Sequence, residues 1–306
     1  MKMLTTAILI VIVTSGVDGQ QVKFKKHENV IYGMISGMAL LMDIYQPEKS
    51  NHRGVIFIGG SGFGVYDSYQ RIYNQKPLKG DYTGDQYAGK FAQQLVDKGY
   101  TVFFIDHRFA PRYHYPDIFY DCQRAVKFIR YNAEKYDIDP KYIGAMGHSS
   151  GAYLSSMLGV VDTTYQNISK NPIDSLSGKV QAVVSLAAPY NLADFNPRQD
   201  SSYNFIIKTL LNYIGEYPKL TKGNFELSGL YAEASPIIHV TENDAAFLKY
   251  HSTDDFIPYR QAVAMNKTLT ETAVASKLVT RQGQGHGPIP DMNEIDLWFK
   301  KYLEIK

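Results

Sequence analysis

Short apolar runs separated by helical patterns constrain the fold of this chain more than any other feature. Runs typical of buried strands lie at residues 55–58, 101–105, 142–146, 180–186, 246–250 and 277–280. The clearest helical pattern lies between the second and third runs and places five residues on one apolar face: Ile118, Cys122, Ala125, Val126 and Ile129. Strands that alternate with helices in this way form a mostly parallel sheet with helices on both faces.

Other parts of the chain fit the same architecture. Further helices are expected at residues 86–98, 152–160, 259–275 and 292–303. Residues 29–45 alternate loosely around Gly33 and Gly37, which is typical of an antiparallel strand pair at a sheet edge. Right-handed crossovers align the carboxyl ends of parallel strands along one edge, where ligands bind. We therefore expect functional residues in the loops that follow the strands.

Two long segments interrupt the alternation of strands and helices. Residues 62–85 are rich in Gly and Tyr, and residues 190–240 separate two predicted strands and have helical potential around 204–213. Loops of this length in a compact domain are usually functional or disordered. There is no internal repeat and no linker in the sequence, so we expect one domain in which residues 190–240 form a lid-like insertion.

The first 19 residues have the order of a secretory signal peptide. Lys2 precedes an apolar run over residues 4–13, and small and polar residues follow up to Gly19. The apolar run is shorter than the roughly 20 residues that a membrane span needs. We expect cleavage after Gly19, export to the periplasm or the medium, and a single domain over residues 20–306 with no membrane span.

Charge and cysteine content exclude several classes of partner and cofactor. The chain has 32 Lys and Arg against 30 Asp and Glu, a net charge of +2. No basic excess is available to hold a polyanion, so nucleic acid is not an expected partner. The single cysteine, Cys122, cannot form an internal disulfide, and its helical position predicts buried packing. The sequence contains no metal-ligand cluster, so we expect neither a metal nor a cofactor.

A Gly-x-Ser-x-Gly pattern follows the third of the apolar runs. Residues 147–151 read Gly-His-Ser-Ser-Gly, directly before a predicted helix. A tight strand-to-helix turn is strained and needs small residues on both sides of a nucleophile. The turn also places Ser149 at a helix amino terminus, where backbone N–H groups favour a developing negative charge. Ser149 is therefore the candidate nucleophile.

A serine hydroxyl needs a positioned base, and the base needs a carboxylate partner. Among the eight histidines, His286 lies in a glycine-rich loop after the last predicted strand, whereas His148 is beside Ser149 and is expected to point elsewhere. Asp254 and Asp255 follow the penultimate strand. The chain order serine, acid, histidine is that of the α/β-hydrolases.

The loop after the first central strand is a candidate oxyanion hole. Residues 58–63 read Ile-Gly-Gly-Ser-Gly-Phe, and glycines there let backbone N–H groups approach a negatively charged oxygen. We expect the N–H groups of Gly60, Ser61 and Ser150 to form the hole. A phosphate-binding loop is disfavoured because no Lys-Ser or Lys-Thr pair follows and no Gly-x-Gly-x-x-Gly opens a helix.

Together these motifs resemble those of α/β-hydrolases of the esterase and lipase group that carry a His-Gly-Gly-Gly-Trp type oxyanion loop. The chain is similar to secreted carboxylesterases and to feruloyl or acetyl esterases of bacterial carbohydrate degradation. The matching stretches are residues 41–47, 55–63, 106–111, 147–151, 234–241, 247–262 and 285–287. The resemblance runs from about residue 29 to the end and implies an α/β-hydrolase fold, with a mostly parallel central sheet flanked by helices.

The sequence departs from the family pattern at two motifs. Gly59 stands where the oxyanion loop usually has histidine, and Ser61 stands at the third loop position. The motif that bears the acid is one residue short before Pro258. Counting forward from His251 selects Asp255 as the acid, and counting back from Pro258 selects Asp254. We choose Asp255, because the strand fixes the start of this loop more tightly than the following helix fixes its end.

The resemblance implies a serine hydrolase that cleaves a carboxylic ester, small or glycan-linked, through an acyl-enzyme on Ser149, Asp255 and His286. A serine peptidase or amide hydrolase is an alternative, because the same triad cleaves amides. A catalytically silent binding protein is a third. Tyrosines in the two long segments suit sugars or aromatic acyl groups, or they simply cover the surface. They are Tyr66, Tyr69, Tyr73, Tyr82, Tyr87, Tyr203, Tyr213, Tyr217 and Tyr231.

Overall fold

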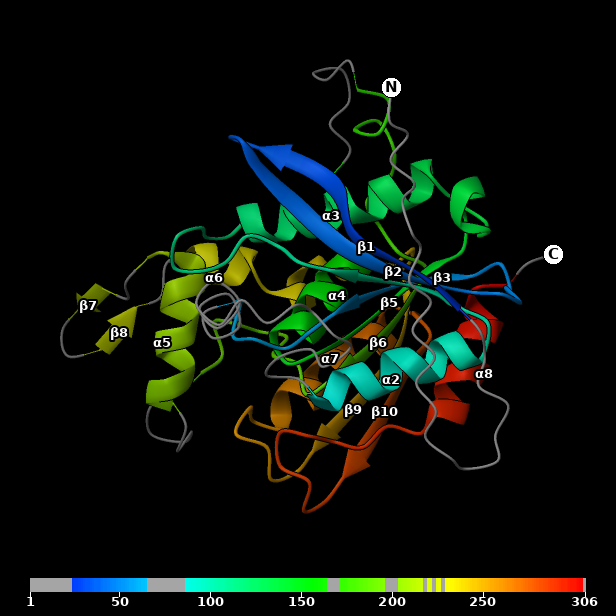
Figure 1. Cartoon of the computed structure of the whole chain (residues 1–306). Coiled ribbons are helices and arrows are strands. Elements are labelled where there is room, and N and C mark those ends of the chain that lie inside the picture. The colour runs from blue at the N-terminus through cyan, green and yellow to red at the C-terminus, as the bar shows by residue number, and fades with distance from the viewer. Residues whose placement is uncertain are drawn as a thin grey trace, which may run out of the picture.

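An eight-stranded sheet forms the centre of the protein (Figure 1). The computed structural model describes residues 24–64, 86–163, 171–195, 203–216, 219–221, 224–226 and 229–304. The strand order across the sheet is β1-β2-β4-β3-β5-β6-β9-β10. The strands are β1 (Phe24–Ile35), β2 (Met38–Pro47), β3 (Gly54–Ile58), β4 (Thr101–Ile105), β5 (Ile143–His148), β6 (Ala182–Leu186), β9 (Ala246–Ser252) and β10 (Ser276–Arg281).

The sheet is parallel except at one edge. β1 pairs antiparallel with β2, and β2 pairs antiparallel with β4, whereas the pairs from β4 through β3, β5, β6 and β9 to β10 are all parallel. The central strands β3, β4, β5 and β6 have almost no exposed residues, because helices cover both of their faces. This arrangement explains why their sequences are continuous apolar runs rather than alternating ones.

Helices form two separate hydrophobic cores against the sheet. One core includes residues of α3 (Asp117–Tyr131), α4 (Ser150–Val160) and α7 (Arg260–Glu271). The other includes residues of α2 (Gln86–Asp97) and α8 (Met292–Tyr302). Figure 1 shows α3 on one side of the sheet and α2 and α8 on the other. The two faces together confirm the predicted α/β-hydrolase architecture, with a mostly parallel sheet flanked by helices.

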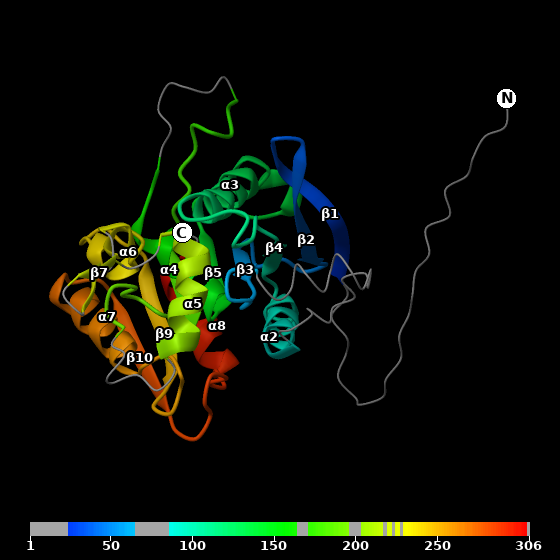
Figure 2. The same cartoon turned by 90° about the vertical axis from the view of Figure 1, so that its left-hand side faces the viewer.

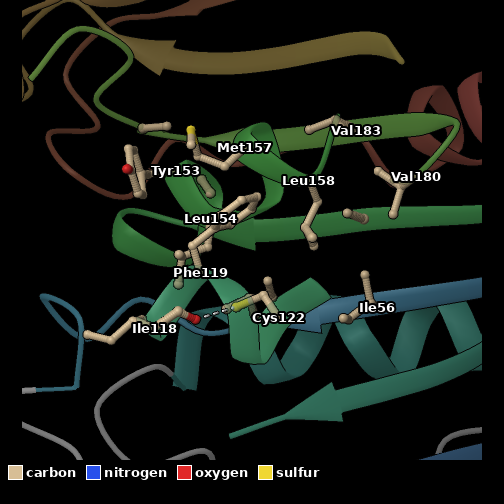
Figure 3. Packing of buried hydrophobic residues seen from close by; sticks show 14 of the residues in the cluster. Ile56, Ile118, Phe119, Cys122, Tyr153, Leu154, Met157, Leu158, Val180 and Val183 are labelled. Carbon is tan, nitrogen blue, oxygen red and sulfur yellow. Dashed lines mark hydrogen bonds between the residues drawn. The ribbon is translucent and has the colours of Figure 1, made fainter. Parts of the chain in front are cut away.

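Cys122 packs inside the first of these cores (Figure 3). Its side chain is fully buried, and its thiol donates a hydrogen bond to the carbonyl of Ile118 at 3.4 Å. Figure 3 also shows Phe119 and Leu154 close to this cysteine. The predicted packing role of Cys122 is therefore confirmed.

The segment between β6 and β9 contains several short elements. They are α5 (Tyr203–Ile214), β7 (Lys219–Thr221), β8 (Asn224–Glu226), α6 (Gly229–Glu233) and η2 (Pro236–His239). Elsewhere in the chain, a short helix η1 (Glu134–Tyr136) follows α3. Figures 1 and 2 show α5 near α6, beside one end of the sheet. The expected helix at 204–213 is therefore present.

Some expectations fall on residues outside the described ranges. The predicted signal peptide (residues 1–19) and most of the Tyr-rich loop (residues 65–85) lie there. Among the residues that the structure does describe, no helix combines the length and the apolar character needed to cross a membrane.

Candidate active site

Ser149 lies at a sharp turn between β5 and α4, at the carboxyl end of a central strand. Its backbone has a φ of 53° and a ψ of −121°, a strained conformation for a residue with a side chain. The backbone N–H of Ser149 donates to the carbonyl of Leu186 on the neighbouring strand at 2.8 Å. The turn is thereby fixed to β6, and the serine hydroxyl is presented at the edge of the sheet.

Gly151 shows why this turn needs small residues. A Cβ added at Gly151 would lie 2.0 Å from the carbonyl oxygen of Ile58, at the end of β3. Any side chain here would push α4 away from the sheet and displace Ser149. The glycine of the motif is therefore dictated by the close approach of two backbones.

The structure brings Ser149, His286 and Asp255 together in one chain of hydrogen bonds. The Nε2 atom of His286 lies 2.8 Å from the Oγ atom of Ser149, and its Nδ1 atom lies 2.8 Å from Oδ1 of Asp255. The His286 side chain is 21% exposed, whereas that of Asp255 is completely buried. The carboxylate is therefore shielded from water, and the imidazole is open to the space in front of Ser149.

Asp254 does not contact the His286 ring. Its Oδ2 atom accepts a hydrogen bond from the backbone N–H of Gly285 at 3.1 Å, and its Oδ1 atom accepts one from the Ser252 hydroxyl at 2.6 Å. These bonds, the Ser252 bond most of all, lower the pKa of Asp254. Of the two adjacent acids, Asp255 faces the imidazole and Asp254 holds the backbone of the loop that carries it.

A second histidine lies behind Asp255. The side chain of His251 is fully buried, and its Nε2 atom lies 2.9 Å from the carbonyl of Ile257 and 3.7 Å from Oδ2 of Asp255. Burial lowers the pKa of His251, and the nearby Asp255 offsets this effect only in part. Burial thus disfavours the charged form of the imidazole that lies behind the Asp255 carboxylate.

His148 points toward the loop of His286, and it is His286 that bonds the Ser149 hydroxyl. Its Nε2 atom lies 2.6 Å from the backbone carbonyl of His286, and the two imidazole rings are 4.8 Å apart. Because His148 directly precedes Ser149, its side chain lies where the end of β5 meets the loop after β10. Sequence spacing gave no signal of this contact, because 138 residues separate the two histidines.

The candidate oxyanion loop differs from the prediction at Ser61. Its backbone N–H donates to the Ser150 hydroxyl at 3.0 Å. The buried Ser150 side chain needs a partner, and the loop amide beside it supplies one. Gly60, Ser61, Gly62 and Ser150 all border the cavity in front of Ser149. The three predicted residues therefore lie together, but the Ser61 N–H is already engaged.

An apolar cavity of about 320 Å³ opens in front of Ser149. The glycine-rich loop, α5 and the loop after β9 contribute its walls. Its apolar lining residues are Phe63, Pro189, Phe205, Ile206, Leu210, Phe256 and Ile257. Among the α5 residues whose side chains the structure describes at the cavity, Thr209 alone is polar. Such a cavity suits the apolar part of a small ligand.

The aromatic side chains around this cavity connect α5 to the residues beside Ser149. Phe205 contacts Phe256 edge-on at 5.5 Å, and the Phe256 ring lies 4.0 Å from that of His286. At the other end of α5, Tyr213 stacks on Phe63 at 3.7 Å. No sequence pattern points to Phe205, which lies in the insertion, but Phe256 could have been singled out because it follows Asp255 directly.

The tyrosine hypothesis fails where the structure tests it. Tyr213 and Tyr231 are fully buried, so they pack inside the protein and present no face to a sugar. The other seven tyrosines lie among residues whose side chains the structure does not describe, so the hypothesis is not tested there.

A mostly parallel sheet with a strained serine turn, a histidine and an aspartate at the carboxyl ends of its strands defines the class of α/β-hydrolases with a serine nucleophile. Within this class, the chain belongs to the BD-FAE family, whose sequence model matches residues 42–269.

Curated relatives agree with this classification. The chain is 28% identical over 198 residues to the esterase LipC of Mycobacterium tuberculosis, an alignment that covers 63% of this chain and 46% of LipC. It is 26% identical over 194 residues to arylacetamide deacetylase of Bos taurus, with coverages of 60% and 43%. The chain therefore spans less than half the length of these relatives.

Solved structures show the same fold. A truncated carbohydrate esterase from gut microbiota superposes with a TM-score of 0.71 at 23% identity, over 93% of this chain and 98% of the other. An esterase of Thermogutta terrifontis, Est2, superposes with a TM-score of 0.62 at 18% identity, over 93% and 89%. At these identities, the likeness concerns the fold.

Proposed function

We propose that the protein is a serine hydrolase that cleaves carboxylic esters through an acyl-enzyme intermediate. The observation that carries this proposal is the hydrogen-bonded series Ser149, His286 and Asp255 at the mouth of an apolar cavity. A serine hydroxyl becomes a useful nucleophile only when a base within about 3 Å removes its proton. The relatives named as esterases support the same reaction.

In the first step, Nε2 of His286 takes the proton of Ser149 while Oγ attacks the ester carbonyl. Asp255 accepts the Nδ1–H of His286, and so fixes the tautomer in which Nε2 is the base and stabilises the imidazolium that forms. The imidazolium then protonates the leaving alcohol. In the second step, water is deprotonated by the same histidine and hydrolyses the acyl-enzyme.

The negative oxygen of the tetrahedral intermediate is held by backbone N–H groups of Ser150 and of the loop that contains Gly60 and Ser61. Ser150 begins helix α4, so its N–H carries the positive end of the helix dipole. The Ser61 N–H joins the hole when it exchanges its bond to the Ser150 hydroxyl for one to the substrate oxygen.

The ester has a small apolar acyl group and an alcohol that is either small or carbohydrate-linked. The apolar lining and the volume of about 320 Å³ support the acyl assignment. The carbohydrate esterase from gut microbiota, which shares the fold over 98% of its length, supports the alcohol assignment. We also propose that residues 1–19 are removed on export. Residues 20–306 then form one domain, in which residues 190–240 make a partial lid.

Amide hydrolysis is a second candidate, because the relatives include proteins named arylacetamide deacetylase. A hydrolysis panel separates the candidates: nitrophenyl acetate, butyrate and octanoate, methyl ferulate, acetylated xylan, and an aminoacyl anilide. We expect turnover of the short-chain esters and little turnover of the octanoate. Preference for the anilide would favour the amide hydrolase. Absence of turnover on every substrate would contradict both candidates and favour a binding protein.

A further inference from the structure

We propose that His148 is a positioning residue that holds His286 in register with Ser149, an inference that rests on the proposed function. An N–H group of the His148 imidazole, next to the nucleophile, donates a hydrogen bond to the backbone of His286, the candidate base. His148 Nε2 lies 2.6 Å from the His286 carbonyl oxygen. The bond joins two segments that each supply one reacting group.

The loop that carries His286 runs over residues 282–291, between β10 and α8, and is otherwise tied to the side of the molecule that holds the acid. Side-chain hydrogen bonds to its backbone from outside the loop include those of Tyr250, Ser252, Asp254 and Arg281. All four of these residues lie on or just after β9 and β10. The bond from His148 differs, because it comes from β5, the strand that leads into Ser149.

The His148 ring is confined on its other side by the oxyanion loop. A Cβ added at Gly60 would lie 2.7 Å from Nδ1 of His148 and 3.0 Å from Cβ of Ser149. One imidazole therefore contacts the oxyanion loop and the histidine loop while it is covalently joined to the nucleophile turn. A side chain in this place sets the distance between Nε2 of His286 and Oγ of Ser149, which is 2.8 Å here.

The contact matters for the reaction because proton transfer depends steeply on geometry. A displacement of the base by about 1 Å costs roughly 10²-fold in rate. His148 borders the cavity, but the apolar walls that would hold the substrate come from α5 and from Phe63, Phe256 and Ile257. Loss of the His148 bond should therefore lower kcat much more than it changes KM.

The test compares three substitutions of His148 in the full chain. In His148→Gln the amide nitrogen reaches about as far as Nε2 and retains a donor. In His148→Asn the amide stops short of the His286 carbonyl, and in His148→Phe the ring remains but the donor is lost. His239→Phe is the matched control, because His239 also bonds a backbone carbonyl through Nε2 but is not among the residues that line the cavity in front of Ser149.

We expect the Phe and Asn variants to lose about 10- to 100-fold in kcat on nitrophenyl butyrate, with KM within about threefold of the wild-type value. The Gln variant should recover most of kcat, and His239→Phe should match the wild type. The rate of labelling of Ser149 by a fluorophosphonate should follow the same order. Melting temperatures identify any variant that is poorly folded, in which case the Asn and Gln pair decides the question.

Three results would overturn the proposal: kcat of the Phe and Asn variants close to that of the wild type, equal losses in the Gln and Asn variants, or a change in KM alone. Each would leave the proposed function intact as long as the wild-type enzyme hydrolyses esters. An inactive wild-type enzyme would instead contradict the proposed function itself, so the two failures are distinguishable.

Discussion

At the scale of single residues, Asp254 and Asp255 are neighbours in sequence but act on the histidine loop in different ways. Asp255 bonds the imidazole of His286, and Asp254 bonds the backbone N–H of Gly285. Asp255→Asn should lower kcat about 10³- to 10⁴-fold, because the tautomer of His286 is no longer fixed. Asp254→Asn should lower kcat by less than about tenfold, because it removes one of the two acceptor oxygens that hold Gly285 and Ser252 but leaves the Asp255–His286 bond in place. Steady-state kinetics of the two matched variants checks this, and a larger loss at Asp254 would exchange their roles.

Lys249 is a second residue whose behaviour can be predicted. It lies fully buried on β9, and its Nζ atom bonds the Ser276 hydroxyl at 2.5 Å. Burial lowers the pKa of Lys249 from 10.5 to about 7. Between these pH values the unfolded chain binds more protons than the folded one, so stability rises as the pH rises from 7 to 10.5 and the cost of burial is complete below pH 7.

Lys249→Met should therefore stabilise the protein by on the order of 2 kcal/mol at pH 7, and the gain should shrink toward zero as the pH approaches 10. Urea unfolding of the wild type and the variant at pH 7, 8.5 and 10 measures the difference. Lys267→Met is the control, since the Lys267 side chain is 72% exposed and should give no such dependence. A gain in stability of Lys249→Met that does not depend on pH would contradict the lowered pKa of Lys249.

Sequence motifs led to Ser149 and His286 because each lies in a short pattern after a buried strand. The same reasoning could not decide how side chains pair inside the turn. The donation from Ser61 to the Ser150 hydroxyl and the contact of His148 with His286 depend on which atoms come within 3 Å after folding. Such pairings are properties of packing in three dimensions, and no spacing along the chain encodes them.

At the scale of elements, the bounds of β3, β4, β5, β6, β9 and β10 were predictable to within two residues, because each is a short apolar run. β3 and β4, for example, have no exposed residue. The edge pair was expected to begin at residue 29 and begins five residues earlier, at Phe24. Short elements of the 190–240 segment were not predictable. β7 and β8 have three residues each, and their pairing depends on a turn rather than on an apolar period.

Helix α5 forms part of the wall of the cavity, and Phe205 on this helix tests that role. Phe205 is 49% exposed and contacts Phe256 edge-on. Phe205→Ala should open the cavity and shift the preference from butyrate toward octanoate esters, by about fivefold in the ratio of kcat/KM values. The half-exposed side chain should cost little stability, which a melting temperature checks. Phe128→Ala on α3, which does not line the cavity, serves as the control. An unchanged acyl preference in Phe205→Ala would contradict the assignment of Phe205 to the cavity wall.

At the scale of the whole molecule, two cores on the faces of one sheet stabilise the protein without a disulfide. Cys122, the single cysteine, lies inside one of them, and burial raises the pKa of its thiol well above the ordinary value. The thiol should therefore react with a disulfide reagent only when the domain unfolds. We expect no reaction of the native protein over an hour and one equivalent of reaction in denaturant. Fast labelling of the native protein would show that this core opens locally.

The central claim for the molecule is that Ser149 is an activated nucleophile. The most direct measurement is labelling of the wild-type protein with a fluorophosphonate, followed by mass spectrometry of the labelled peptide. We expect a single adduct on the Ser149 oxygen, formed much more slowly in His286→Ala and absent in Ser149→Ala. Labelling that persists in Ser149→Ala, or a wild-type protein that does not react, would contradict it.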